Sequence, residues 1–418
     1  MIKKVNYLLA FLICFIMLAS SAVPSFALIS DRIEDAGEEQ IQTEEVQTMD
    51  DRIRICTRRG LHTSLPENSS DAVTAAPSEY VSVDVKITKD GVPVLMADET
   101  VDRMCVDASG DKICGRVDSY TLDEISSFYL REGSGGSTKA TEANVTTLDA
   151  IVRTANGKII IIDVNFSDLD EVLEVVNNDA VRQRVILRID GKADRIIDKL
   201  SGEDKVPNII LKYDGNIIFG VNSTIKKAGE SGLSLVQLGT KNHHGVIFYK
   251  SVENKIKKYG LTAVFSMAEP YNARRGDNVT GWDDVISHGF TFIETDYPEL
   301  LNNYISSCEA TKEELKKLIE SCSGYEEGNY PKDLKYEFDK AYKNAVETAG
   351  RASSNSQLGD ALTALSKAAS ALDSAQNEST AASVFHFSAG RIITVALCLA
   401  AVLGAQIYFY KRRQNEKQ

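Results

Sequence analysis

Short apolar runs alternate with longer amphipathic segments through the first three quarters of this 418-residue chain. The runs are three to seven residues long and rich in Val, Ile and Leu, a composition that predicts β-strands. They lie at residues 54–56, 80–86, 92–96, 159–164, 185–189, 209–211, 233–238, 263–267 and 290–294. Connecting segments such as 121–129, 147–155 and 168–177 have the length of helices.

Two of the runs contain uninterrupted apolar stretches, namely Ile-Ile-Ile-Ile at 159–162 and Val-Ile-Leu at 185–187. Strands of this kind are covered by helices on both faces of a parallel sheet. The alternation therefore predicts an α/β fold, a TIM-type (β/α)8 barrel with one extra strand over residues 52–306. A doubly wound open sheet is the alternative, but no Gly-x-Gly-x-x-Gly motif follows the first strand.

After Tyr304 the pattern changes to apolar residues at spacings of three and four. This periodicity predicts helices at 312–322, 332–349 and 357–372. Together they predict a small three-helix bundle over residues 308–373.

The two ends of the chain predict where the protein resides. Lys3 and Lys4 precede an apolar run and then small residues up to Ala27, the order of a signal peptide at 1–27. Residues 28–51 follow as an acidic disordered spacer, since 31–51 hold nine acidic residues, one basic residue and no aromatic residue.

Near the other end, residues 392–410 carry no charge, which predicts a transmembrane helix at 391–410 after a linker at 374–388. A buried core helix is the alternative. The tail at 411–418 opens with Lys-Arg-Arg, so the positive-inside preference places it in the cytoplasm. The chain is thus predicted to be a single-pass plasma-membrane protein with an extracellular body.

Composition narrows the chemistry further. The formal charge of −13 argues against nucleic acid as a partner. Outside the two terminal segments there are five cysteines, an odd number that argues against a full disulfide framework. A short Cys105–Cys114 bridge across a polar loop is left as an open possibility.

Several motifs carry a resemblance to a known family. They include Arg-Arg-Gly at 58–60, Pro-Glu-Asn at 66–68, Ser-Val-Asp at 82–84, and the segment 88–100. Further matches occur in order at 116–125, 145–151, 161–165 and 293–301. These motifs, in this order, resemble those of the glycerophosphodiester phosphodiesterase family. The resemblance implies a TIM barrel in which two histidines act as general acid and base and three carboxylates hold a divalent cation.

The chain departs from that family at the residues that carry the chemistry. Arg58 and Ala97 stand where the family has histidines, and Ser82 stands where it has a metal-binding glutamate. A guanidinium stays protonated near neutrality and alanine has no proton to transfer. The resemblance leaves Asp84 and Asp163 as ligands of a weakly held Ca²⁺ or Mg²⁺.

The resemblance also implies a substrate-binding role for retained residues. Arg59, with Arg58 beside it, is predicted to contact phosphate, since a guanidinium binds phosphate through two parallel hydrogen bonds. Glu67 is predicted to support the same loop. The alternative is that Arg59 and Glu67 form a buried pair that only fastens the loop. His62 lies close enough in sequence to approach the site, although a solvated histidine is the more ordinary interpretation.

The predicted bundle resembles the FIVAR-type repeat of Gram-positive surface proteins, on its Gly-Asn-Tyr-Pro turn at 328–331 and its alanine-rich third helix. This resemblance implies a Gram-positive bacterium as the source.

Three functional hypotheses follow. The first is a membrane-anchored extracellular protein whose phosphodiesterase-like domain is catalytically impaired and binds an anionic phosphodiester or polyol of the cell envelope. The second is an active metal-dependent phosphoric diester hydrolase of lipid metabolism. The third is a structural or protein-binding surface module.

Overall fold

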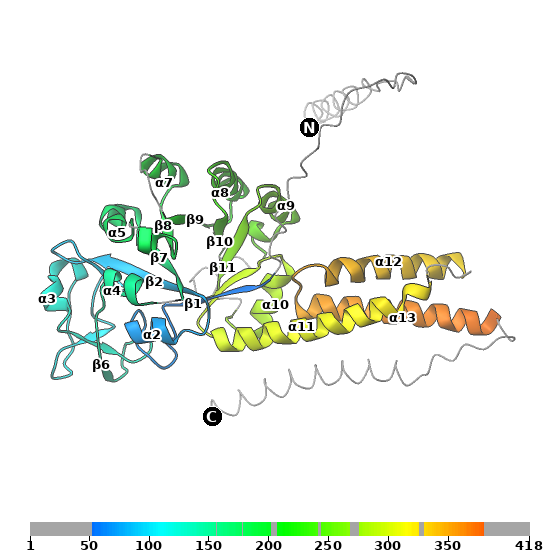
Figure 1. Cartoon of the computed structure of the whole chain (residues 1–418), viewed down its shortest axis with the longest axis horizontal. Helices are drawn as coiled ribbons and strands as arrows, with labels where there is room; N and C mark the ends of the chain where they lie inside the picture. The colour runs from blue at the N-terminus through cyan, green and yellow to red at the C-terminus, as the bar shows by residue number, and fades with distance from the viewer. Residues whose placement is uncertain are drawn as a thin grey trace, which may run out of the picture. The chain divides into compact units, whose positions relative to one another are not determined.

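Eight parallel strands close into a barrel in this computed structural model (Figure 1). The strands are β1 (Arg54–Arg58), β2 (Tyr80–Ile87), β7 (Ile159–Asn165), β8 (Val185–Asp190), β9 (Asn208–Asp214), β10 (Leu235–Gly239), β11 (Thr262–Ser266) and β12 (Phe292–Thr295). Strand β1 pairs with both β12 and β2, which closes the sheet. The predicted TIM-type barrel is confirmed, and the alternative of an open sheet is wrong.

The structure describes residues 52–155, 157–177, 179–201, 207–240, 244–267, 276–325 and 330–379. The predicted signal peptide, acidic spacer, transmembrane helix and tail lie outside these ranges, as does most of the linker. Among the helices within them, none is both long and apolar enough to cross a bilayer.

Helices cover the outer face of the barrel. They are α2 (Ser70–Ala75), α4 (Leu148–Thr154), α5 (Leu169–Val176), α6 (Asp179–Arg182), α7 (Ala193–Leu200), α8 (Ile218–Glu230), α9 (Lys250–Lys258), α10 (Val279–Ser287) and α11 (Pro298–Ser321). The outward strand residues pack against them in the main hydrophobic core, as Val83, Ile162 and Leu187 do. Burial on both sides accounts for the uninterrupted apolar runs in the sequence.

A separate apolar layer fills the barrel interior. Its buried members are Cys56, Ile161, Ile186, Ile210, Leu235, Val264 and Phe292. Because side chains alternate along a strand, the next inward positions toward the carboxyl ends lie two residues further on. Those positions form the mouth of the barrel, where this fold places its sites.

An insertion follows β2. Strand β3 (Pro93–Leu95) pairs antiparallel with β2. Strands β4 (Cys105–Val106), β5 (Tyr129–Arg131) and β6 (Ala140–Asn144) form a second, antiparallel sheet with its own small core. The prediction of a helix over 121–129 is right only for α3 (Leu122–Ile125), which Thr121 and Glu124 begin with a reciprocal capping box. It is wrong beyond that, because α3 ends at Ile125 and Tyr129 begins strand β5, whose next residue Leu130 is buried in the insertion core.

Three helices extend beyond the barrel, namely the distal part of α11, α12 (Lys332–Ala349) and α13 (Asn355–Ser379). Phe338, Leu362 and Leu365 are among the buried residues between them. The same helix α11 that follows β12 continues into this bundle without a break. Side-chain contacts add to the covalent link, because Tyr304 donates to Asp283 Oδ1 at 2.7 Å and Ser356 also donates to Asp283.

Cys105 and Cys114 are not bonded to each other, and all five cysteines in the described ranges are free thiols. The turn between Cys105 and Cys114 is closed by Asp107 instead. The Asp107 carboxylate accepts from the backbone of Ser109 at 2.8 Å and of Asp111 at 2.9 Å. A side-chain turn of this kind fixes the loop without a covalent link.

Candidate functional site

The inward positions above the apolar layer are polar. Ser82 on β2, Asp163 on β7, Arg188 on β8, Gln237 on β10 and Glu294 on β12 lie there, and all but Asp163 are fully buried. The strand register sets Asp163 opposite Arg188. The side chains inside the barrel therefore change from apolar to polar or charged over two residues of each strand.

Arg188 is the centre of this polar layer. Its Nε donates to Asp163 Oδ1 at 2.5 Å, and its Nη2 contacts the other oxygen of Asp163. Nη2 also donates to Glu294 Oε1 at 2.7 Å, and Nη1 donates to Gln237 Oε1 at 2.7 Å. The side chain is 2% exposed. One buried guanidinium thus connects four strands through charge-assisted hydrogen bonds.

The pKa values in this layer follow from burial and from Arg188. Burial alone would raise the pKa of Glu294, but the contact with Arg188 lowers it to about 2. Burial raises the pKa of Asp163 to about 6, with Arg188 opposing and the negative charges of Asp84 and Glu294 adding to the rise. The two carboxyls therefore titrate on opposite sides of their ordinary range around a single fixed cation.

The two carboxylates predicted as metal ligands are both engaged by basic side chains. Asp163 holds Arg188, and Asp84 Oδ2 accepts from Arg59 Nε at 2.7 Å and from Asn68 Nδ2 at 2.9 Å. A Ca²⁺ ion takes six to eight oxygen ligands. Within the described part of the chain, no group of three His, Cys, Asp or Glu residues is arranged to hold a metal. These donors do not fit a divalent cation.

Arg58 is the last residue of β1, at the position of a family histidine. Its Nε donates to Asp296 Oδ1 at 2.7 Å and its Nη2 to Asp296 Oδ2 at 3.0 Å. Burial opposes charge at this site, yet the two-pronged contact with Asp296 raises the pKa of Arg58. Arg58 is thus a fixed cation whose charge is already balanced, and it offers no proton for transfer.

Arg59 and Glu67 meet in the first strand-to-helix loop. Arg59 Nη1 lies 3.3 Å from the Glu67 carboxylate, while Arg103 Nη2 from the insertion donates to Glu67 at 2.6 Å. Glu67 is only 2% exposed, so it is a buried acceptor shared by two arginines. The arrangement agrees with the loop-fastening role and leaves Arg59 facing Asp84.

The backbone of this loop needs Gly60. Its φ is +73°, and a Cβ there would lie 2.4 Å from the carbonyl carbon of Ala72 in α2. Arg59 itself has φ +56°, a left-handed conformation that is uncommon for a residue with a side chain. The strained turn is what directs the Arg59 guanidinium toward Asp84 and Glu67.

His62 does come close to the site, as one prediction held. Its Nδ1 lies 2.9 Å from the Arg58 carbonyl and 3.1 Å from the Gly60 carbonyl, and its Nε2 lies 3.6 Å from Asp296 Oδ1. The ring is 5% exposed, so the alternative of a solvated surface histidine is wrong. Ala97, at the other family histidine position, is half-buried in the insertion.

Sequence reasoning missed Arg188, Gln237 and Arg103. A signal for Arg188 was present, because it is a lone charge inside the apolar strand Val-Ile-Leu-Arg-Ile. A charged side chain in a strand that is covered on both faces must have a buried partner. No comparable signal marked Arg103, whose partners Glu67 and Asp98 lie in separate motifs.

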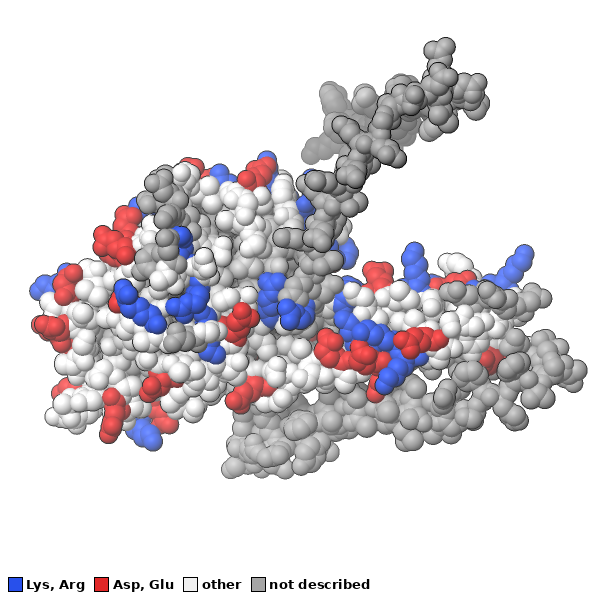
Figure 2. Space-filling view, viewed as in Figure 1, with Lys and Arg blue, Asp and Glu red and all other residues white. Residues whose placement is uncertain are grey.

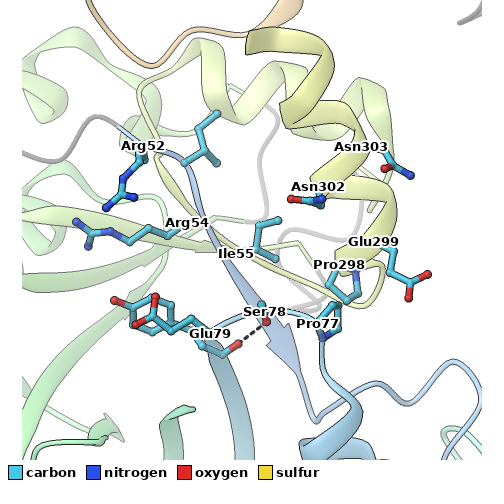
Figure 3. A pocket seen from close by; sticks show the side chains of 12 residues that line it. Arg52, Arg54, Ile55, Pro77, Ser78, Glu79, Pro298, Glu299, Asn302 and Asn303 are labelled. Carbon is cyan, nitrogen blue, oxygen red and sulfur yellow. Dashed lines mark hydrogen bonds between the residues drawn. The ribbon is translucent and has the colours of Figure 1, made fainter. Parts of the chain in front are cut away.

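A pocket of about 830 Å³ lies beside β1 and α11 (Figure 3). Arg52 and Arg54 line it beside the start of β1, while Asn302 and Asn303 line it from α11. Pro298 and Glu299 also line it, but none of the polar-layer residues does. It is not part of the site.

Part of the chain matches a known family. Residues 59–263 match the model of the glycerophosphoryl diester phosphodiesterase family. This family domain covers just under half of the chain. The matched range includes Ser82, Asp163, Arg188 and Gln237 of the polar layer and the loop between β1 and α2. Glu294 on β12 lies beyond it.

Solved structures of family members are similar to the chain at low identity. A glycerophosphoryl diester phosphodiesterase from Parabacteroides distasonis is 21% identical, with a TM-score of 0.46 over 62% of this chain and 88% of that one. A glycerophosphodiester phosphodiesterase from Agrobacterium tumefaciens is 17% identical, with a TM-score of 0.46 over 61% and 99%. An Oleispira antarctica phosphodiesterase in complex with the product sn-glycerol-3-phosphate is 13% identical, with a TM-score of 0.47 over 60% and 95%. No curated protein matches the sequence.

Proposed function

We propose that this chain is a membrane-anchored cell-surface protein whose phosphodiesterase-like domain binds a polyol or phosphodiester of the cell envelope without hydrolysing it. The observation that carries this proposal is the ion pair of Arg58 with Asp296, at a position where the family resemblance calls for a proton-transferring histidine. The family domain supports the scaffold, and the ion pair supports the loss of reaction.

Hydrolysis of a phosphodiester requires both a proton donor and neutralisation of the phosphate charge. Arg58 keeps its proton and Ala97 has none. His62 faces two backbone carbonyls and the same Asp296 that Arg58 holds, so its ring serves the loop rather than a ligand. The carboxylates that would recruit a metal are occupied by Arg59 and Arg188.

The pairing of charges favours hydroxyl-rich ligands over strongly anionic ones. A phosphate would have to displace Asp296 from Arg58 or Asp84 from Arg59 before it gained a guanidinium. A polyol needs no such exchange, because paired carboxylates and guanidiniums still offer acceptors and donors to neighbouring hydroxyls. On the face that Figure 2 shows, acidic and basic side chains are interspersed, with no basic field to attract a polyanion. The polyol part of a teichoic-acid-like polymer is therefore the proposed ligand.

The predicted termini supply the location. The signal peptide at 1–27 and the transmembrane helix at 391–410 would hold the barrel outside the cell, with the cytoplasmic tail at 411–418. The FIVAR-like bundle would act as a spacer between the barrel and the membrane. The FIVAR resemblance also supports a Gram-positive envelope as the setting.

An active phosphoric diester hydrolase is the second candidate. The family match and the approach of His62 Nε2 to Asp296 at 3.6 Å favour it, because an imidazole beside a carboxylate is a recurrent acid–base arrangement. This candidate requires His62 to leave its backbone contacts and reach a ligand.

The deciding experiment uses the full chain in detergent micelles. We expect no release of glycerol phosphate from glycerophosphocholine with Ca²⁺, Mg²⁺ or a chelator, and we expect calorimetric binding of glycerol- or ribitol-based oligomers. Binding through hydroxyls should change little between low and high salt, whereas binding of an anion should weaken. Metal-dependent turnover that His62→Gln abolishes would establish the hydrolase instead. A failure to bind any polyol, with no turnover, would leave the domain as a structural or protein-binding module.

A further inference from the structure

The Arg188 guanidinium occupies the centre of an oxygen-lined space inside the barrel. We infer that Arg188 replaces the divalent cation of the family site, as a permanent internal cation that makes the folded barrel independent of metal. The inference concerns the charge balance of the polar layer. This role of Arg188 does not depend on polyol binding, so an experiment can contradict either proposal without contradicting the other.

The partners of Arg188 are the kind of ligand that hard cations prefer. They are the two carboxylate oxygens of Asp163, Oε1 of Glu294 and the amide oxygen Oε1 of Gln237. These oxygens come from β7, β12 and β10, and they converge on one side chain of β8. Carboxylate and amide oxygens arranged around one point form the ligand set of Ca²⁺ and Mg²⁺ sites. Here the point is filled by nitrogen-bound protons.

The charges near this point come close to balance only if Arg188 is counted. Asp84, Asp163 and Glu294 supply three carboxyls, against which Arg59 and Arg188 supply two fixed cations. One negative charge is thus left over even with both cations present. Without Arg188, the fully buried Glu294 would lose its cationic partner, a change that is strongly destabilising.

The same balance excludes an added metal ion. A divalent cation could reach the oxygens of Asp163 and Glu294 only by displacing a guanidinium that is 2% exposed. The displaced cation would then be buried among groups that no longer neutralise it. The unaltered protein should therefore gain no stability from Ca²⁺, Mg²⁺ or Mn²⁺.

Removal of the guanidinium should reverse this. In Arg188→Met an unbranched side chain fills part of the space, and the acidic oxygens are left without a cation. We expect this variant to unfold at a lower temperature in a chelator and to be restored by millimolar Mn²⁺, Mg²⁺ or Ca²⁺. Its Kd for Mn²⁺ should be at least roughly ten-fold lower than that of the unaltered chain, since binding to the folded state alone stabilises it.

Three further variants of the full chain make the test specific. Arg58→Met removes another arginine that pairs with one carboxylate, and it should be destabilised without any response to metal. Arg188→Lys keeps a positive charge and should not respond either. Arg188→Met combined with Asp163→Asn should lose the response of the single variant. All four variants are followed by thermal unfolding with circular dichroism, a readout that needs no enzymatic activity.

Two results would overturn the inference. One is a rise in the unfolding temperature of the unaltered chain with a divalent cation that Asp163→Asn abolishes. The other is an Arg188→Met variant that no divalent cation stabilises, whether it is folded or unfolded in the chelator. If Arg188→Met is unfolded in the chelator and folds on addition of Mn²⁺, the inference is supported in its strongest form.

Discussion

The two inner layers of the barrel differ in how they relate to the family. The layer of Ile161, Ile186 and Ile210 is hydrocarbon contributed by neighbouring strands, and it does what any TIM barrel requires. The layer above it, centred on Arg188, consists of buried ion pairs that join Arg188 to Asp163 and Glu294. Only two residues along each strand separate the apolar layer from the charged layer.

This difference teaches that fold and reaction are carried by separable positions. Hydrophobic burial in the lower layer is non-directional and tolerates exchange of similar side chains. The upper layer depends on specific donors, acceptors and charges, so single replacements such as Ser82 and Arg58 alter its chemistry without altering the sheet. A family model can therefore match a chain whose upper-layer residues differ from those that the family resemblance implies.

The largest effect should come from rebuilding the upper layer. The triple variant Arg58→His, Ser82→Glu and Ala97→His should stay inactive, because Arg188 still excludes a metal ion. Adding Arg188→Met should raise metal-dependent hydrolysis of glycerophosphocholine at least ~100-fold above the unaltered chain, within the usual worth of acid–base assistance. Equal activity of the triple and quadruple variants would show that Arg188 does not separate this layer from the active family sites.

Acid sensitivity should distinguish the layers next. Glu294 has a pKa of about 2 in the fold and about 4.5 when exposed, so its folded-state pKa is lowered. Its contribution is present above pH 4.5 and is lost as the pH falls toward 2, a loss of about 3 kcal/mol. Asp163 acts in the opposite direction, because its raised pKa of about 6 weakens the fold as the pH rises from about 4 to 6.

Urea unfolding of the full chain between pH 3 and 7 measures both contributions. Glu294→Gln should flatten the acid limb of the stability curve, and Asp163→Asn should remove the decline toward pH 6. The control is Ile210→Ala in the apolar layer, which should lower stability by about 2–5 kcal/mol at every pH. An acid limb of unchanged slope in Glu294→Gln would contradict the assignment.

The smallest effect on stability should come from the ion pair between Arg58 and Asp296 at the end of β1. Arg58→Lys keeps the charge but loses the two parallel hydrogen bonds to Asp296, and we expect a loss of about 1 kcal/mol. The matched control is Arg153→Lys, whose exposed contact with Asp149 should contribute less than half as much. Chemical denaturation resolves the two, and equal losses would indicate that the Arg58 pair is no more than a surface ion pair.

The barrel could be predicted from the sequence because strands that are buried on both faces contain uninterrupted apolar runs. All nine predicted runs form strands, including β3 as the extra one. Prediction from the sequence failed in the insertion, where β4 has two residues and β5 has three, too short for periodicity to register. Such strands exist through pairing with each other, which the tertiary structure decides.

The site was recovered only in part, for a similar reason. Arg59 contacts Glu67 and Asp84, whereas Arg58 pairs with Asp296 and Asp163 pairs with Arg188. The partners of these side chains could not be predicted from neighbouring sequence, because they are far away along the chain. Asp296 lies 238 residues from Arg58. Gln237 and Glu294 lie 49 and 106 residues from Arg188. Charge pairing across a barrel is a property of the closed sheet. It is fixed only when the last strand meets the first.

Helix α11 has a mechanical consequence. It begins at Pro298, three residues after the last residue of β12, and runs without interruption to Ser321 in the bundle. Tension applied to the bundle would pass along the backbone of α11 directly to β12, the strand that bears Glu294. The hydrogen bond from Ser356 to Asp283 would transmit part of the same force in parallel. A pull on one end of the molecule would thus be felt at the strand that seals the barrel.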